Sequence, residues 1–361
     1  MIIGTVSENK ELEKRISITP EIAKKYISNG FEVMIEKDLA THLGIPDKEF
    51  LEEGCKIDSR ENVLNKSNII LQLNLPDEKS TNILNENKIL IGNFNSSLNK
   101  EVIAKISNKN INVFSMELLP RITRAQSMDI LSSQANLAGY KAVLDSFAMF
   151  KKAIPMMMTA AGTISAAKVL VVGAGVAGLQ AIATAKRMGA IVFATDVRLA
   201  SKEQVESLGG KFLVVEGAEN LETEGGYAKE ATEEFKKKQE ELLAETLKKI
   251  DVVICTALIP GKKAPKIIQE NMIKNMKPGS VIYDLAASQG GNAAFTEADK
   301  IIEKNGVIIV GESTILNKLP TSASNLYAKN LFNFVLNLYD KDNKKININL
   351  EDEIVSKTLV K

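Results

Sequence analysis

Histidine, cysteine and net charge are scarce in this chain of 361 residues, which has one histidine, two cysteines, no tryptophan and a formal net charge of +1 at pH 7. A chain without a strong charge excess is not drawn electrostatically to nucleic acid or to an anionic membrane surface. No window approaches the roughly 18 uninterrupted apolar residues of a membrane-spanning helix, and the first residues carry charges without a signal-peptide core. We therefore expect no nucleic-acid partner and no direct insertion into a membrane.

The few reactive side chains do not form a metal-ligand pattern. Cys55 and Cys255 lie far apart, and Cys255 stands in the apolar run VVICTAL, where a buried thiol is expected. Two such cysteines fit a reducing compartment. The single histidine, His42, lies in THLGIPD without neighbouring ligands, so a surface position is expected for it. We predict no metal site.

One stretch of the sequence carries the clearest functional signal. A short apolar run at 169–172, rich in β-branched residues, predicts a buried strand, and the letters GAGVAG follow it directly. Residues 179–188 have helical spacing, and a second apolar run at 190–195 predicts another strand. A strand, a tight turn, a helix and a strand in this order form the dinucleotide-binding βαβ unit.

The three glycines and the acidic residue that follows have separate tasks in such a unit. Gly173 allows the sharp turn, Gly175 lets the backbone approach a pyrophosphate, and Gly178 lets helix and strand pack closely. The N–H groups at the helix N-terminus then hold the phosphates. Asp196 stands where a ribose-binding acid is expected and favours NAD over NADP, although Arg198 weakens that inference. The alternative is a turn with a purely structural role.

Short strands and helices alternate on both sides of this unit, and the chain is too long for one ordinary core. We therefore expect an α/β fold of two Rossmann-like domains with parallel sheets, joined by long helices around a cofactor cleft. Residues 1–130 with 320–361 form the predicted N-terminal domain, and residues 131–319 form the predicted NAD-binding domain.

Three other segments carry weaker signals. The polar loop at 117–134, ELLPRITRAQSMDILSSQ, lies between the two predicted domains, where loops often carry ligand contacts; Arg121 and Asp129 within it could instead pair with each other. The three methionines at 156–158 are expected to fill a flexible part of the core. The segment 216–226 has few apolar residues, so we expect a mobile loop.

Several long segments of this sequence resemble those of a known family. RITRAQSMDILSSQANLAGY, PMMMTAAGT, GAGVAGLQAIATAKRMGA, KEQVESLGGKF and MKPGSVIYDLA occur in this order. Together they closely resemble the soluble NAD(H)-binding component of proton-translocating NAD(P) transhydrogenase, in a family that also includes alanine dehydrogenase. The resemblance covers nearly the whole chain and is strongest over residues 116–285.

The resemblance implies that the chain binds NAD(H) and exchanges a hydride directly with NADP(H) on a partner subunit. It implies coupling to proton translocation through a separate membrane subunit, because the chain carries no membrane helix of its own. It also implies a homodimer in the cytoplasm, peripheral on the inner face of the membrane through its partner subunits. Such a transfer needs no nucleophile, metal or general base from this chain.

Residue roles follow from the same resemblance. The nicotinamide side would be lined by Arg121, Gln126, Asp129 and Ser132. The adenosine half would be held, beyond the glycines Gly173, Gly175 and Gly178, by Val176, Asp196, Val197 and Arg198. The cleft would be closed by Gly226, Tyr227, Gln239 and Leu258. Arg121, Gln126 and Asp129 are the predicted catalytic residues: Arg121 and Asp129 orient the carboxamide and phosphates, and Gln126 reaches towards the second nucleotide.

The main alternative is an autonomous alanine-type amino-acid dehydrogenase. That reaction needs proton transfer, for which alanine dehydrogenases carry a lysine in one strand and a histidine just after the next. Gln72 and Asn93 stand at these positions here, and neither side chain can shuttle a proton near neutral pH. Arg15, which would bind a substrate carboxylate in that chemistry, is present. A regulatory NAD-binding module without catalysis is a third possibility.

Overall fold

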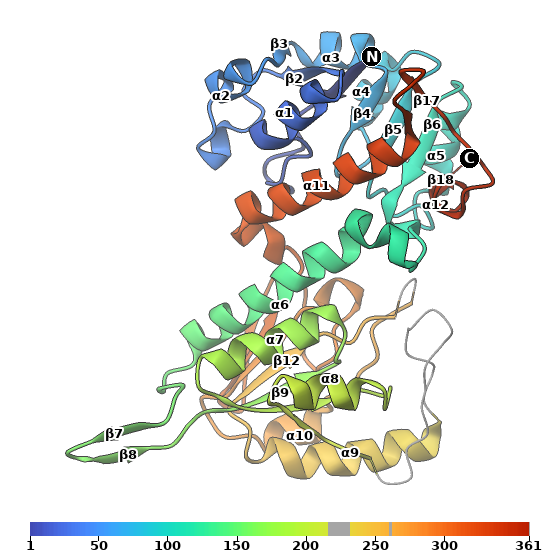
Figure 1. Cartoon of the computed structure of the whole chain (residues 1–361). Coiled ribbons are helices and arrows are strands. Elements are labelled where there is room, and N and C mark those ends of the chain that lie inside the picture. The colour runs from blue at the N-terminus through green and yellow to red at the C-terminus, as the bar shows by residue number, and fades with distance from the viewer. Residues whose placement is uncertain (216–231, 260–261, 361) are drawn as a thin grey trace. The chain divides into compact units, whose positions relative to one another are not determined.

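The structure, a computed structural model, describes residues 1–215, 232–259 and 262–360 (Figure 1). It divides into two compact units, one made of Met1–Gln134 and Leu319–Lys361 and the other of Ala135–Lys318. In the described part of the chain each unit is built on a mostly parallel sheet of seven strands. The predicted α/β fold class is confirmed, with the correction that each sheet ends in an antiparallel strand, β18 (Leu359–Val360) or β14 (Ile301–Lys304).

The first unit has the strand order β18-β6-β5-β4-β1-β2-β3. Apart from β18 its strands are β1 (Ile2–Thr5), β2 (Glu32–Glu36), β3 (Lys56–Asp58), β4 (Ile69–Leu71), β5 (Ile89–Gly92) and β6 (Asn112–Ser115). The branched aliphatic residues of the inner strands β1, β4 and β5 are mostly buried on both faces, as is typical of parallel strands, whereas the edge strand β3 is partly exposed. Since β4 and β5 are parallel neighbours, the residues that follow them lie at the same edge of the sheet.

Helices cover both faces of this first sheet. They are α1 (Pro20–Ser28), α2 (Asp47–Glu52), α3 (Arg60–Lys66), α4 (Glu78–Ile83), α5 (Lys100–Ser107), α11 (Pro320–Leu338) and α12 (Glu353–Thr358), with 3-10 turns η1 (Thr41–Leu43), η2 (Met116–Leu118) and η3 (Thr123–Met128). Proline opens both α1 and α11, where its missing N–H costs nothing. The apolar face of α11 packs on the sheet through Phe334, whose ring lies 5.4 Å from that of Phe114.

The second unit has the strand order β11-β10-β9-β12-β13-β15-β14. Apart from β14 its strands are β9 (Lys168–Val172), β10 (Ile191–Thr195), β11 (Lys211–Phe212), β12 (Val252–Cys255), β13 (Val281–Asp284) and β15 (Val307–Gly311). The chain leaves β9 towards β10 and β11, then returns to the other side of β9 for β12. The strand order therefore reverses between β9 and β12, and ligands of open parallel sheets bind at the carboxyl ends of strands at such a point.

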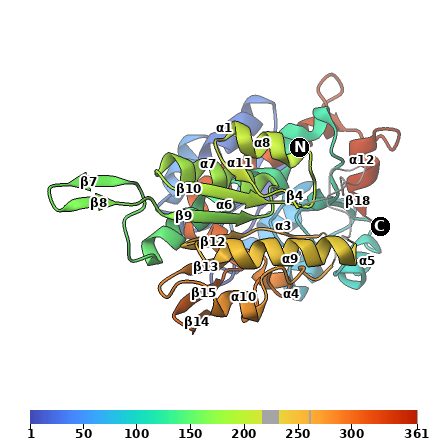
Figure 2. The same cartoon turned by 90° about the horizontal axis from the view of Figure 1, so that it is seen from below.

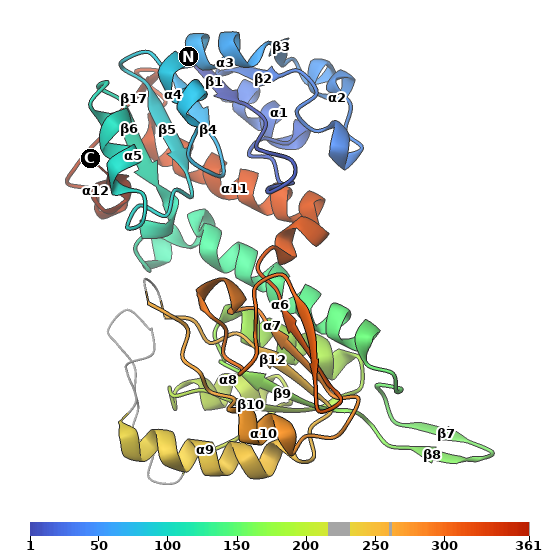
Figure 3. The same ribbon diagram turned by 180° about the vertical axis from the view of Figure 1, so that it is seen from behind.

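The helices of the second unit lie on opposite faces of its sheet, as Figures 2 and 3 show. One core cluster combines strand residues with α6 (Ile130–Met149), α7 (Val176–Arg187) and α8 (Ser201–Ser207). The other combines alternate strand residues with α9 (Glu233–Leu247) and α10 (Glu270–Lys274). The 3-10 turns η4 (Ala287–Gln289) and η5 (Ile315–Lys318) complete the unit. The predicted strand–helix–strand unit is confirmed as β9, α7 and β10.

Two hairpins stand outside these sheets. One, formed by β16 (Tyr339–Asp340) and β17 (Lys345–Ile346), belongs to the first unit. The other, formed by β7 (Met157–Thr159) and β8 (Gly162–Ile164), projects from the second unit (Figure 2). The expectation that residues 156–158 fill the core is wrong, because Met156, Met157 and Met158 are 64%, 45% and 81% exposed. No helix in the described ranges is long and apolar enough to cross a membrane.

Candidate functional site

The glycine turn between β9 and α7 is shaped by three different constraints. Gly173 has φ of 93°, and a Cβ there would lie 2.8 Å from Thr256 Oγ1. A Cβ on Gly178 would lie 1.8 Å from the carbonyl oxygen of Gly173, so helix and turn touch backbone to backbone. A Cβ on Gly175 would meet no described atom within 4 Å. The protein itself thus requires Gly173 and Gly178, whereas the space above Gly175 is open to a ligand.

A threonine from the neighbouring strand holds this turn in place. Thr256 directly follows β12, and its hydroxyl donates to the carbonyl oxygens of Val172 at 3.1 Å and Gly173 at 2.9 Å. The side chain of Asn292 fixes Ala257, the residue after Thr256. It accepts from the N–H of Ala257 at 3.0 Å and donates to the carbonyl of Ala257 at 2.8 Å. Sequence patterns did not reveal Thr256 or Asn292 as site residues. Thr256 stands just after an apolar run, which was the one available signal.

The carboxylate of Asp196 is fixed at the end of β10. Its Oδ2 accepts the N–H of Ala174 at 2.7 Å, which ties β10 to the glycine turn. Its Oδ1 accepts the backbone N–H and the Nε of Arg198, both at 2.9 Å, and Arg198 Nη2 lies 2.8 Å from Oδ2. The two side chains are only 6% and 16% exposed. Because Arg198 offsets the charge of Asp196, this carboxylate would repel a 2′-phosphate less strongly than the sequence suggested.

The loop assigned to the nicotinamide lies in the first unit, where Asp129 caps α6. Asp129 Oδ1 accepts the N–H of Ser132 at 2.9 Å, and its Oδ2 accepts the Ser132 hydroxyl at 2.5 Å. Arg121 and Gln126 are exposed on the same loop, while Asp129 and Ser132 are half-buried. An aspartate at this position satisfies N–H groups that no helix carbonyl can reach. Asp129 therefore has a structural task besides any contact with a nucleotide.

Amide side chains of helix α11 form hydrogen bonds with the loop that precedes α6. Asn330 Nδ2 and Asn333 Nδ2 both donate to the carbonyl of Ser127, at 2.8 Å and 3.0 Å. Arg124 pairs with Asp352 through two hydrogen bonds of 2.9 Å and 2.6 Å, and this guanidinium lowers the pKa of Asp352 to about 2. The sequence offered no signal for these anchors, because some 200 residues separate them from the loop.

Gln72 and Asn93 lie side by side at the carboxyl ends of β4 and β5. The backbone N–H of Asn93 donates to the carbonyl of Leu73 at 3.0 Å, and Gln72 is 3% exposed. Neither amide side chain titrates, so neither can be the proton-transfer group that an amino-acid dehydrogenase is expected, from the sequence, to carry here. The one histidine, His42, is exposed and bonds to the carbonyl of Lys14 at 2.8 Å, which confirms its expected surface position.

A half-buried acid, Glu8, lies beside this edge of the sheet. Glu8 accepts the N–H of Leu73 at 2.8 Å and two donors of Asn74 at 3.3 Å and 3.1 Å. Burial raises the pKa of Glu8, and these hydrogen bonds lower it without cancelling that effect. A raised pKa in the folded state means that the ionised carboxylate costs stability once the pH exceeds that pKa.

Replacing Glu8 by glutamine should therefore stabilise the protein near pH 7. The gain should shrink as the pH falls towards the unfolded-state pKa of about 4.5, because Glu8 is then protonated in the folded protein. Thermal unfolding of both proteins across this pH range measures the difference. Glu11→Gln, at an exposed position nearby, is the control. A Glu8→Gln protein that is less stable at pH 7 would show that the hydrogen bonds outweigh burial.

The remaining predicted residues are distributed as follows. Gly226 and Tyr227 lie outside the described residues. Gln239 is half-buried on α9, Leu258 is 43% exposed just after β12, and Val176 is 38% exposed at the start of α7. The described residues contain no group of three or more His, Cys, Asp or Glu that could hold a metal ion. Cys255 is fully buried, as expected, and burial raises the pKa of its thiol.

Comparison with known proteins settles the family. The model of the alanine dehydrogenase/PNT C-terminal domain matches residues 142–361, and that of the N-terminal domain matches residues 4–138. The chain belongs to the alanine dehydrogenase/PNT family. It is 49% identical over 368 residues to the first part of the NAD(P) transhydrogenase alpha subunit of Rhodospirillum rubrum, with 100% of this chain and 96% of that protein covered. The family resemblance inferred from the sequence is confirmed.

Within the alanine dehydrogenase/PNT family the chain is a homologue of the transhydrogenase subunits. The solved transhydrogenase structure from Sinorhizobium meliloti matches with a TM-score of 0.88 and 43% identity, covering 99% of this chain and 98% of that one. Alanine dehydrogenase 1 of Staphylococcus aureus is 26% identical, with 94% of this chain and 88% of that protein covered.

Proposed function

We propose that this chain is the NAD(H)-binding subunit of a proton-translocating NAD(P) transhydrogenase and exchanges a hydride directly with NADP(H) held by a partner subunit. The observation that carries the proposal is the pair of amides, Gln72 and Asn93, at the edge where an amino-acid dehydrogenase needs proton-transfer groups. The 49% identity to a transhydrogenase subunit along the whole chain supports it. Bound NADH supplies the hydride. This chain therefore has to bind the nucleotide, orient its nicotinamide and exclude water, and it does not have to donate protons.

The second unit carries the residues proposed to bind the adenosine half. The open space above Gly175 fits a pyrophosphate, which the N–H groups at the start of α7 would hold. Asp196, whose lone pairs are all engaged by Ala174 and Arg198, would accept from a ribose hydroxyl in place of one of its bonds to the Arg198 side chain. Pre-organisation of this carboxylate reduces the entropy lost on binding. The other proposed contacts of this half are Gly173, Val176, Gly178, Val197, Gly226, Tyr227, Gln239 and Leu258.

The first unit carries the residues proposed for the nicotinamide side. Asp129 and Arg121 would orient the carboxamide and phosphates, with Ser132 beside them, and Gln126 would extend towards the second nucleotide. The anchoring of this loop on α11 supports the proposal, because direct transfer needs both reacting carbons held at a fixed distance. The exposed position of Gln126 suits a residue that meets another subunit.

We also propose a homodimer, attached to the inner face of the membrane through its partner subunits in the cytoplasm. The exposed hairpin of β7 and β8 supports self-association, since Met158 is 81% and Ile164 is 43% exposed. Tyr140 on α6 adds a further exposed aromatic ring, at 40%. Adjacent exposed apolar side chains of this kind are typical of interaction surfaces. NADP-binding and membrane-spanning transhydrogenase subunits are the proposed partners.

Mixing the purified chain with an NADP-binding transhydrogenase subunit tests the function. NADH should then reduce thio-NADP⁺, followed by the absorbance of the product, while either protein alone should be inactive. NADH binding without exchange would overturn the transhydrogenase proposal and leave a regulatory module. Alanine-dependent reduction of NAD⁺ by the isolated chain would instead establish the dehydrogenase.

A further inference from the structure

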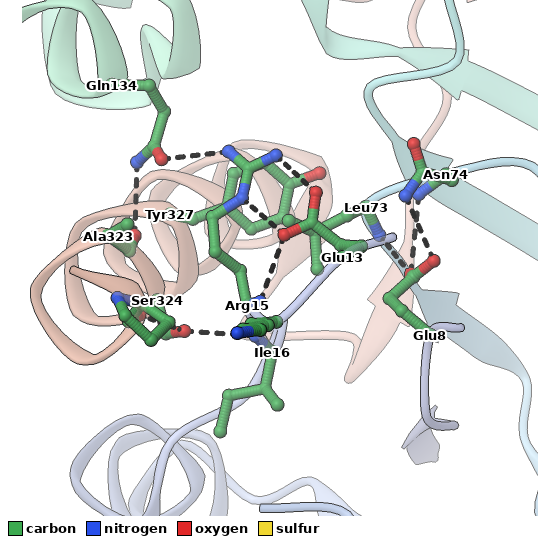
Figure 4. Close-up of polar contacts among 12 residues, drawn as sticks. Glu8, Glu13, Arg15, Ile16, Leu73, Asn74, Gln134, Ala323, Ser324 and Tyr327 are labelled. Atoms are coloured by element: carbon green, nitrogen blue, oxygen red, sulfur yellow. Dashed lines mark hydrogen bonds and ion pairs between the residues drawn. The ribbon is translucent and has the colours of Figure 1, made fainter. Parts of the chain in front are cut away.

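All three nitrogens of the Arg15 guanidinium are engaged inside the first unit (Figure 4). Nε and Nη2 donate to the two carboxylate oxygens of Glu13 at 2.8 Å and 2.6 Å, and Nη1 donates to Gln134 Oε1 at 2.9 Å. The side chains of Arg15 and Glu13 are only 14% and 11% exposed, and Gln134 is 8% exposed. Glu13 therefore occupies the two Arg15 donors, Nε and Nη2, that would otherwise bind a substrate carboxylate. The third nitrogen, Nη1, donates to Gln134 of α6.

The same network reaches α11. Gln134 Nε2 donates to the carbonyl of Ala323 at 3.1 Å, and the backbone N–H of Ile16 donates to Ser324 Oγ at 3.0 Å. Figure 4 shows the contacts converging from the loop before α1, the start of α6 and the start of α11. A guanidinium suits such a junction, because its rigid fork holds a carboxylate with two donors and directs a third donor elsewhere.

Gln134 belongs to the part of α6 that begins with the Asp129 cap. The preceding residue, Ser133, donates to Asn330 Oδ1 of α11 at 2.6 Å. Consecutive residues of an α-helix point about 100° apart around its axis. Anchors at both Ser133 and Gln134 therefore fix the rotation of the helix as well as its position. Any turning of α6 about its axis would move the turn that contains Asp129 and Ser132.

We propose that Arg15 is a positioning residue of the hydride-exchange site, which acts through Gln134 to set the rotation of the first turn of α6 and so the orientation of Asp129 and Ser132. Without Arg15, Gln134 Oε1 is a buried acceptor that has lost its donor, a state that favours any rotation bringing this oxygen to water. The catalytic part of this inference rests on the proposed function, whereas its structural part does not.

Arg15→Met tests the catalytic part in the assay with the NADP-binding subunit. The kcat of exchange should fall about tenfold while the KM for NADH changes less than about threefold, because alignment is lost rather than binding. Arg15→Lys should be nearly as damaging, since one ammonium cannot hold Glu13 and Gln134 together in the same geometry. Arg60→Met is the matched control. Arg60 makes a comparable set of contacts in the same unit, to Glu36, Ser80 and Ser7.

Two further measurements separate positioning from a general loss of stability. Amide hydrogen exchange at residues 132–135 of the isolated chain should speed up about tenfold in Arg15→Met and Arg15→Lys but not in Arg60→Met. Gln134→Met should lower kcat as Arg15→Met does, and the double variant should be no worse than either single variant. These residues act as one unit, so their effects should not add.

Three results would overturn the proposal: unchanged amide exchange in Arg15→Met, restoration of wild-type kcat by Arg15→Lys, or additive losses in the double variant. Failure of the wild-type chain to exchange hydride with the partner would overturn the proposed function alone. The amide-exchange comparison would still decide whether Arg15 positions α6.

Discussion

Gly175→Ala should weaken NADH binding by at least about a hundredfold while leaving the folded protein intact. The new Cβ meets no described atom within 4 Å, and φ of −76° at this residue suits an L-amino acid. A bound pyrophosphate, however, would have to approach this backbone directly. Displacing it would forfeit one or two charge-assisted hydrogen bonds from the α7 N-terminus, each worth about 1.5–3 kcal/mol. Fluorescence titration of NADH measures the affinity, and thermal unfolding measures the stability.

Gly178→Ala is the contrasting variant in the same motif. Its Cβ would lie 1.8 Å from the carbonyl oxygen of Gly173, and neither backbone can move without separating α7 from β9. We expect a loss of stability of about 3 kcal/mol or more. A Gly175→Ala protein that binds NADH as tightly as the wild type would show that this turn does not hold a pyrophosphate.

Asp129→Asn should lower the rate of hydride exchange about a hundredfold with little effect on stability. Asparagine caps a helix about as well as aspartate, so the N–H of Ser132 keeps an acceptor. The variant loses the charge and one acceptor oxygen proposed to orient the carboxamide. Misorientation of a reacting group by about 1 Å is enough for a hundredfold loss. Exchange kinetics with the NADP-binding subunit and NADH titration of the isolated chain separate catalysis from binding.

Asp129→Ala distinguishes the two tasks of this residue. It removes the cap as well as the charge, so it should cost about 1 kcal/mol of stability in addition to the loss of exchange. If Asp129→Asn retained full exchange and only Asp129→Ala were impaired, the role of Asp129 would be capping alone. Equal losses in NADH binding and exchange would place it with the binding residues instead.

The βαβ unit could be predicted because its signals are local. Strand propensity at 169–172, the glycine spacing and the helical pattern that follows all lie within about 30 residues, and each agrees with the others. The distinction between the glycines could not be predicted in full. The need for Gly173 comes partly from Thr256, which directly follows β12 and is 83 residues away in the sequence. Only the strand order, which puts β12 beside β9, brings the two together.

The methionine segment shows where sequence patterns mislead. Three adjacent methionines are apolar and suggested a place in the core, yet residues 157–164 form a two-stranded hairpin whose side chains are exposed. Burial depends on whether another surface covers a segment, and no pattern within eight or nine residues contains that information. The exposed hairpin is instead the surface proposed above for self-association.

The sequence by itself determined the family, the α/β class and the strand–glycine turn–helix unit, and it predicted that Gln72 and Asn93 replace a proton-transfer pair. These depend on the identity and local spacing of residues. Only the tertiary structure showed the contacts of Arg15, Asp129 and Asp196. Arg15 forms a salt bridge with Glu13 and a hydrogen bond with Gln134 of α6. Asp129 caps α6, and Asp196 forms a salt bridge with Arg198. Buried polar groups must find partners wherever the fold brings them, and distant pairings such as Arg15 with Gln134 exist only once the chain has folded.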